Sequence, residues 1–361
     1  MEFLRLCGLA RYMSCDSAGK YDILSCKKRV IKECLGTGLI KELAGGCQCY
    51  RLTRRGRDLL YKSGYSIYED VRPHKQGSIF DRRIHHGDIC LMMHCAGIDI
   101  FAETMEGLDK ADYIYIPSLI VRSKTKSKVL AGTKFYGILR INDTAYVVYY
   151  CDEENDGIYL EYEEQTFNNY ISGLKNVRHT KILIVSDTME GLLSTVFTTE
   201  QKELQNSLVP FSEIMERWDY DFHVLPLNMD GVTGLKLISN NNIQERIAKR
   251  FGEKQPKMKF FDAVNNGYGY IVGLDMNISK MKRTLAYSTN CNLTPHIVGL
   301  PYQCDIYDAL AEKIHYPNEI EFSSLNKIKL KEQFPELKTV EEKPMPVKLK
   351  NGEYVELWEK E

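Results

Sequence analysis

Three carboxylates in the middle of the chain have the residue type and spacing of a metal-dependent nuclease site. Asp152 follows a predicted strand. Glu161 lies on the next one (158–162) and Glu163 directly after it, and this i, i+2 spacing places the two carboxylates on one face. Carboxylates so placed bind Mg²⁺, which activates water for phosphodiester hydrolysis. A restriction-type site needs a lysine where Glu163 stands. We therefore expect no catalytic residues and no cofactor, and keep a Mg²⁺-dependent nuclease using Asp152, Glu161 and Glu163 as an alternative.

A second group has the residue types of a zinc site. His86, Cys90 and His94 are spaced by four residues, which places them on one face of a helix. No fourth ligand in a familiar spacing accompanies them, so we predict a packed helix face and no metal site. His85 and His86 are adjacent and diverge, unlike the paired histidines of a relaxase metal site. The sequence has no G-x-x-x-x-G-K-[ST] motif, which argues against ATP or GTP use.

Basic residues near the start of the chain have the composition of a phosphate-binding surface. The candidates are Lys27, Lys28, Arg29, Lys32, Arg51, Arg54, Arg55 and Arg57. Residues 1–64 contain thirteen Lys or Arg and six Asp or Glu, a net charge of +7, and the rest of the chain totals −8. Such asymmetry favours DNA, because each neutralised phosphate releases counterions. A solvated basic face is the alternative explanation of the charge alone.

The order of elements around these residues decides between the two explanations. Residues 25–37 are predicted to form a recognition helix, and residues 38–40 lead out of it. Residues 44–46 are predicted to form a turn, and residues 50–53 the returning strand of a wing. This is the order of a winged helix-turn-helix. The recognition helix would enter the major groove of duplex DNA, and the arginines of the wing would hold phosphates.

The remaining chain is predicted to be an α/β protein, α+β overall. Residues 135–141 and 144–150 flank the hairpin turn Asn142-Asp143, and a strand (158–162), a helix (165–174), an apolar strand (181–185) and a helix (189–197) follow. Hairpin, strand, helix, strand is the core order of restriction-endonuclease-like folds, which many other α/β proteins share. Residues 112–121 read as a further strand.

These patterns divide the chain into five parts. They are a winged helix-turn-helix (1–66), a connector with a bridging helix capped by Ser78 (67–98), a mixed-sheet α/β domain (99–238), a β-α-β-α unit that extends the same sheet or stands apart (239–315), and a charged tail with a hairpin at Asn351-Gly352 (316–361). In the fourth part, Asn277 or Ser279 is expected to cap one helix and Asp305 the next.

The chain resembles the replication-relaxation family of bacterial plasmids and integrative elements. The residues concerned are Gly38-Leu39-Ile40, residues 50–56, and His85-His86 within a helix that ends before Gly97; residues 135–185 resemble the family loosely. The resemblance implies a DNA-binding accessory protein in plasmid relaxation, mobilisation or replication control, with a relaxase or another mobile-element protein as partner. A full motif needs one more helix before the recognition helix, which residues 16–24 must supply.

We therefore expect a protein that binds double-stranded DNA and is not an enzyme. A transcriptional repressor with an α/β effector domain is an alternative, and a homodimer is the alternative to a monomer. Eleven cysteines in a chain of this size indicate reduced thiols and a cytoplasmic location. No apolar run approaches the roughly 20 residues of a membrane span, so we expect no membrane partner.

Overall fold

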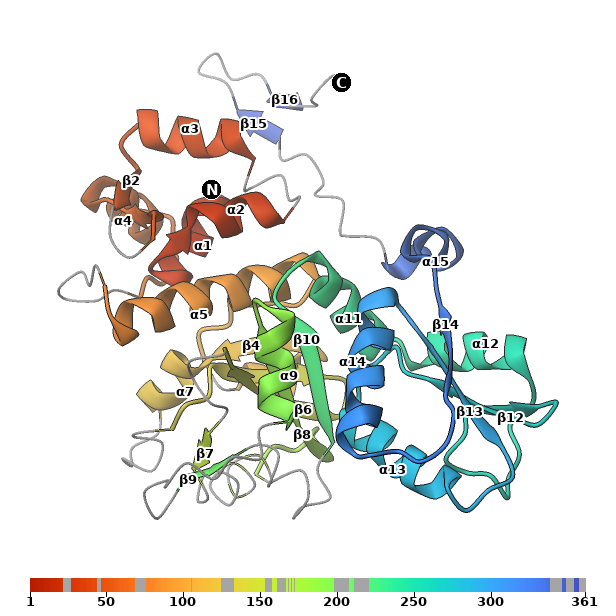
Figure 1. Ribbon diagram of the computed structural model, residues 1–361. Helices are drawn as coiled ribbons and strands as arrows, with labels where there is room; N and C mark the ends of the chain where they lie inside the picture. The colour runs from red at the N-terminus through yellow and green to blue at the C-terminus, as the bar shows by residue number, and fades with distance from the viewer. Residues whose placement is uncertain are drawn as a thin grey trace.

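The computed structural model describes residues 1–21, 27–43, 47–68, 76–104, 106–124, 133–152, 158–160, 167, 169, 171, 173–197, 208–210, 221–337, 346–348 and 354–356. Helices and mixed sheets alternate along these residues, which confirms the α+β class (Figure 1). Within the described part of the chain, no helix combines the length and the apolar character that crossing a membrane requires.

The N-terminal unit contains a three-stranded antiparallel sheet in the order β1-β3-β2. Its elements are α1 (Glu2–Ala10), β1 (Met13–Ser14), α2 (Cys15–Lys20), α3 (Lys28–Gly36), β2 (Ile40–Leu43), β3 (Cys49–Leu52) and α4 (Arg54–Lys62). Helix α2 is the additional helix that the sequence required within 16–24. It forms because the Ser14 hydroxyl accepts hydrogen bonds from the amides of Asp16 and Ser17. The predicted turn at 44–46 lies outside the described residues.

A long helix, α5 (Ser78–Cys95), connects the N-terminal unit to the first large sheet (Figure 1). It packs against α1 and β1 on one side and β4 on the other, and most of its side chains are buried. The prediction that Ser78 caps it was wrong. Gly77 is the N-cap, at a φ of +85° that favours glycine, and no side chain caps the helix.

The first large sheet has five strands in the order β10-β8-β6-β5-β4. The elements of this part are α6 (Gly107–Lys110), β4 (Tyr113–Pro117), α7 (Ser118–Lys124), β5 (Gly137–Ile141), β6 (Thr144–Tyr150), β7 (Ile158–Leu160), β8 (His179–Ser186), α9 (Met189–Phe197), β9 (Leu208–Pro210) and β10 (Phe222–Pro226). Strands β4, β5 and β6 are antiparallel neighbours, and β6, β8 and β10 are parallel.

Two local predictions for this part of the chain were correct and one was wrong. The hairpin at Asn142-Asp143 is confirmed, since Ile141 pairs with Thr144 and Asn142 has a φ of +54°. Helix α9 has the predicted bounds. The strand expected over 112–121 ends at Pro117, after which the chain turns into α7. Strand β7 pairs with β9 instead of joining the large sheet.

The following part of the chain builds a sheet of its own, in the order β11-β12-β13-β14. Its elements are α11 (Met229–Ser239), α12 (Asn241–Phe251), β11 (Ala263–Asn265), β12 (Tyr268–Val272), α13 (Ile278–Ser288), β13 (Thr294–Gly299), α14 (Pro301–Lys313), β14 (Glu321–Ser324), α15 (Lys327–Gln333) and the 3-10 helix η3 (Pro335–Leu337). Of the two alternatives left open by the sequence, these strands therefore stand apart from the first sheet. A backbone bridge joins His223 on β10 to Asn277 at the start of α13.

Asparagine side chains cap three helices of this second unit: Asn228 caps α11, Asn277 caps α13 and Asn326 caps α15. Asn277 caps α13 as predicted, because its side-chain oxygen accepts a hydrogen bond from the amide of Lys280. Asp305 lies inside α14, which begins at Pro301, so the expected cap there was wrong. Strands β15 (Pro346–Lys348) and β16 (Tyr354–Glu356) form the predicted terminal hairpin, although its turn lies outside the described residues.

Candidate nucleic-acid interface

Helix α3 presents a basic face to solvent and an apolar face to the protein. Lys28, Arg29 and Lys32 are exposed, and their spacing places them on one side of the helix. Ile31 and Cys34 are 7% and 8% exposed on the other side, where they join the main hydrophobic core. The apolar spacing fixes the orientation of the helix, so three cations face outward together.

The first turn of α3 adds backbone donors to this face. Lys27 is the N-cap residue and is half-buried, and no side chain among the described residues caps the helix. The first amides of an α-helix have no partner within the helix, and the helix dipole makes this end favourable for anions. A phosphate near Lys28 could therefore accept hydrogen bonds from the backbone as well as from side chains.

The start of α4 lies against the end of α3. Nη1 of Arg55 donates to the carbonyl oxygen of Thr37 at 2.9 Å, and Oγ1 of Thr53 donates to that of Gly38 at 2.6 Å. Gly56 permits this approach, because a Cβ atom there would lie 2.1 Å from the carbonyl oxygen of Leu39. These contacts hold the start of α4, with the exposed residues Arg54 and Arg55, at the C-terminal end of α3.

Three of the eight predicted DNA-binding residues are not fully exposed. Lys27, the N-cap of α3, is half-buried, and two arginines are also covered. Arg51 is 8% exposed, and its guanidinium lies 5.4 Å from the centre of the Tyr12 ring. It is buried because β3 is the central strand of its sheet and α1 packs on it. Arg57 is half-buried one turn into α4. Five residues remain on the exposed surface, which we call the basic face: Lys28, Arg29, Lys32, Arg54 and Arg55.

The carboxylates of the nuclease alternative are only partly described. Asp152 is half-buried after β6, whereas Glu161 and Glu163 lie outside the described residues. Beside Asp152, the hydroxyl of Tyr150 donates to Asp187 at 3.0 Å, and the His85 ring stacks on Tyr150 with centroids 3.7 Å apart. Among the residues that the structure places, no three His, Cys, Asp or Glu side chains are arranged to hold a metal ion.

The tyrosine in this cluster retains its proton. Burial raises the pKa of Tyr150 far above its usual value, and the negative charge of Asp187 raises it further. Tyr150 is therefore a poor nucleophile, and the stacked pair is suited to packing. No local pattern indicates this pair, because its members are 65 positions apart in the chain and come from α5 and β6.

The face of α5 that carries His86, Cys90 and His94 packs within the protein. His86 is 7% exposed and its Nε2 lies 3.8 Å from Sγ of Cys90. Burial lowers the pKa of His86 to about 3, so its ring is neutral. His94 contacts Glu2 on α1 at 2.6 Å, and this contact lowers the pKa of that carboxyl group. The three side chains therefore join α5 to itself and to α1.

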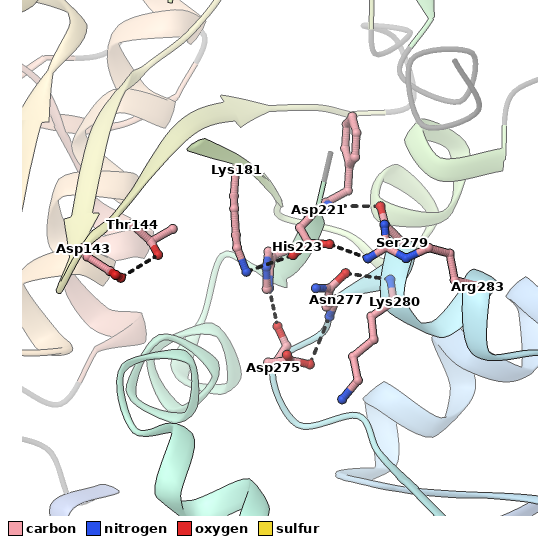
Figure 2. A network of polar contacts seen from close by, with 11 residues as sticks. Asp143, Thr144, Lys181, Asp221, His223, Asp275, Asn277, Ser279, Lys280 and Arg283 are labelled. Carbon is pink, nitrogen blue, oxygen red and sulfur yellow. Dashed lines mark hydrogen bonds and ion pairs between the residues drawn. The ribbon is translucent and has the colours of Figure 1, made fainter. Parts of the chain in front are cut away.

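A polar network connects the two large sheets around Asp221 (Figure 2). Its carboxylate accepts from Nζ of Lys181 on β8 at 2.9 Å and from Nη2 of Arg283 on α13 at 2.7 Å. Burial by itself would raise the pKa of Asp221, but the two cations outweigh it and hold the pKa below its usual value. Lys280 pairs with Asp262 at 3.1 Å. The network therefore fastens one sheet to the other.

Comparison with protein-family models, with curated protein sequences and with solved structures finds no match to this chain. The case for a function therefore depends on geometry and charge. The basic face has five exposed cations on two elements that hydrogen bonds hold together.

Proposed function

We propose that this protein binds duplex DNA through its N-terminal unit, which we interpret as a winged helix. The observation that carries the proposal is the basic face on α3 and the start of α4. The element order supports it, since α1, β1, α2, α3, β2 and β3 follow one another as in a winged helix-turn-helix. Helix α3 is the recognition helix in this interpretation.

The dimensions and charges suit a major-groove contact. An α-helix with its side chains is about 10–12 Å across, and the major groove of B-DNA is about 12 Å wide. Lys28, Arg29 and Lys32 would reach phosphates or base edges beside α3, and Arg54 and Arg55 would hold the backbone next to it. Figure 1 shows α3 at the edge of the molecule.

We further propose a supporting role for the α/β part, in an accessory protein of a plasmid or integrative element that acts with a relaxase or a related protein. The antiparallel order β4-β5-β6, followed by the parallel strand β8, supports a nuclease-like scaffold. At the end of β6, the hydroxyl of Tyr150 donates to the carboxylate of Asp187, which directly follows β8, so a hydrogen bond to a protonated tyrosine engages that carboxylate. This observation favours a scaffold over an active nuclease.

Fluorescence anisotropy with a labelled mixed-sequence duplex tests the proposal. The triple variant Lys28→Ala/Arg29→Ala/Lys32→Ala should bind at least tenfold more weakly at low salt, because it loses three phosphate contacts. A matched control, Lys249→Ala/Lys254→Ala/Lys329→Ala, removes the same charge from exposed positions of the second unit. Equal weakening of both triple variants, or none in the first, would reject the assignment of the basic face.

A further inference from the structure

A crevice lies where the two large sheets meet, away from the basic face. It has a volume of about 560 Å³ and is lined by residues 178–181 at the start of β8, by Asp221, by Phe260 and by Arg283 on α13. Parts of the chain more than 100 positions apart in sequence build its walls. The sequence therefore contains no local motif for it.

The lining is cationic. Arg178, Lys181 and Arg283 contribute three positive charges and Asp221 one negative charge, so the lining carries +2 with His179 neutral. Asp221 bonds to both Lys181 and Arg283 and so fixes their positions at the wall (Figure 2). Arg178 is exposed and has no ion-pair partner among the residues that the structure places. Two cations held in place by Asp221 and an exposed arginine suit a phosphate group.

An aromatic ring completes the crevice. Phe260 is half-buried, and its ring packs against Tyr287 with centroids 4.8 Å apart. Nζ of Lys259 lies 5.3 Å from the centre of the same ring. Nucleic-acid-binding sites without sequence preference combine cations for the phosphate with aromatic rings for the bases.

The crevice is separate from the basic face. Figure 1 shows α3 at one end of the molecule and α13, which carries Arg283, towards the other. The crevice is therefore a candidate for a second ligand.

We propose that this crevice binds a nucleotide, with its phosphate at Arg178, Lys181 and Arg283 and its base against Phe260. The nucleotide is either free or part of a single strand, because both present the same phosphate and the same base. Binding here does not depend on the DNA contact of α3. The two sites can therefore be tested separately in the full-length chain.

The test measures three probes against two crevice variants. The probes are a fluorescent ten-nucleotide thymidylate strand, adenosine monophosphate and inorganic phosphate, and the variants are Arg178→Ala and Phe260→Ala. All proteins carry the triple substitution Lys28→Ala/Arg29→Ala/Lys32→Ala, so that α3 contributes little to strand binding. Lys249→Ala is the matched control, since it removes an exposed cation outside the crevice.

We expect Phe260→Ala to weaken strand binding by about fivefold or more through lost stacking. Arg178→Ala should flatten the salt dependence of log K by about 0.7 for one lost phosphate contact, and Lys249→Ala should change neither. If adenosine monophosphate also binds, and both variants weaken its binding, the natural ligand can be a free nucleotide. If only the thymidylate strand binds and responds to the variants, the natural ligand is a single strand. Binding of no probe, binding of phosphate alone, or binding that neither variant alters would overturn the proposal. Duplex binding by the unsubstituted chain tests the basic face, and its outcome is independent of the test of the crevice.

Discussion

Replacing Asp88 by asparagine should change how the stability of the protein depends on pH. Asp88 is on α5 and is 4% exposed. One carboxylate oxygen has no hydrogen-bond partner in the described structure. Burial raises the pKa of Asp88 from 3.8 to about 7, against a hydrogen bond with Ser17 that lowers it, and Asp187 raises it further.

The sign follows from proton linkage. Between about pH 4 and pH 7 the folded carboxyl group keeps a proton that the unfolded chain has released, so the unfolding free energy falls as the pH rises. The shift is about three units, and each unit corresponds to about 1.4 kcal/mol, so ionised Asp88 costs roughly 4 kcal/mol above pH 7. Asparagine has the same shape and stays neutral. Asp88→Asn should therefore be more stable than the natural chain at pH 8.5, by up to about 4 kcal/mol, and close to it at pH 4.

Urea unfolding followed by circular dichroism at pH 4, 5.5, 7 and 8.5 measures this difference. Asp305→Asn, at an exposed position of α14, is the control for removing one carboxylate, and it should show no such trend. A stability difference between Asp88→Asn and the natural chain that is the same at every pH would refute the reasoning. So would a variant that is less stable at pH 8.5.

Two further predictions concern the contacts that hold the units in place. Asp221→Asn should lower the thermal midpoint at pH 7, measured by calorimetry. The pKa of Asp221 is lower in the folded protein than in the unfolded chain, so its ionised form stabilises the fold at any pH above the unfolded-state pKa. The loss in the variant should shrink as the pH falls below that unfolded-state pKa, and a loss that stays the same would contradict the assignment. Gly56→Ala should cost about 2 kcal/mol or more of unfolding free energy, since the added Cβ would meet the Leu39 carbonyl oxygen. Gly36→Ala, with open space around it, should cost under about 1 kcal/mol, and equal losses would show that the close approach is unimportant.

The sequence predicted features that depend on neighbouring residues. The turn at Asn142-Asp143, the bounds of α9 and the cap at Asn277 were correct, because each follows from local backbone preferences and nearby hydrogen bonds. Of the four cations predicted on the recognition helix, Lys28, Arg29 and Lys32 are exposed, whereas Lys27 is half-buried at the N-cap.

Features set by distant pairing were not predictable in this way. Arg51 appeared to be a wing cation, but the burial of β3 from both sides is decided by α1 and the neighbouring strands. The separation of the two large sheets depends on which strands pair across long stretches of chain. The crevice at Asp221 combines β8, α13 and the segment with Phe260, so no spacing in the sequence indicates it.

The salt dependence of duplex binding tests the central claim most directly. If all five residues of the basic face contact phosphates, log K should fall with log salt concentration with a slope of about −4.5, at about 0.9 per contact. The variant Lys28→Ala/Arg29→Ala/Lys32→Ala should flatten that slope by about 2.7. A slope that this variant leaves unchanged would contradict the claim that α3 and the start of α4 bind DNA.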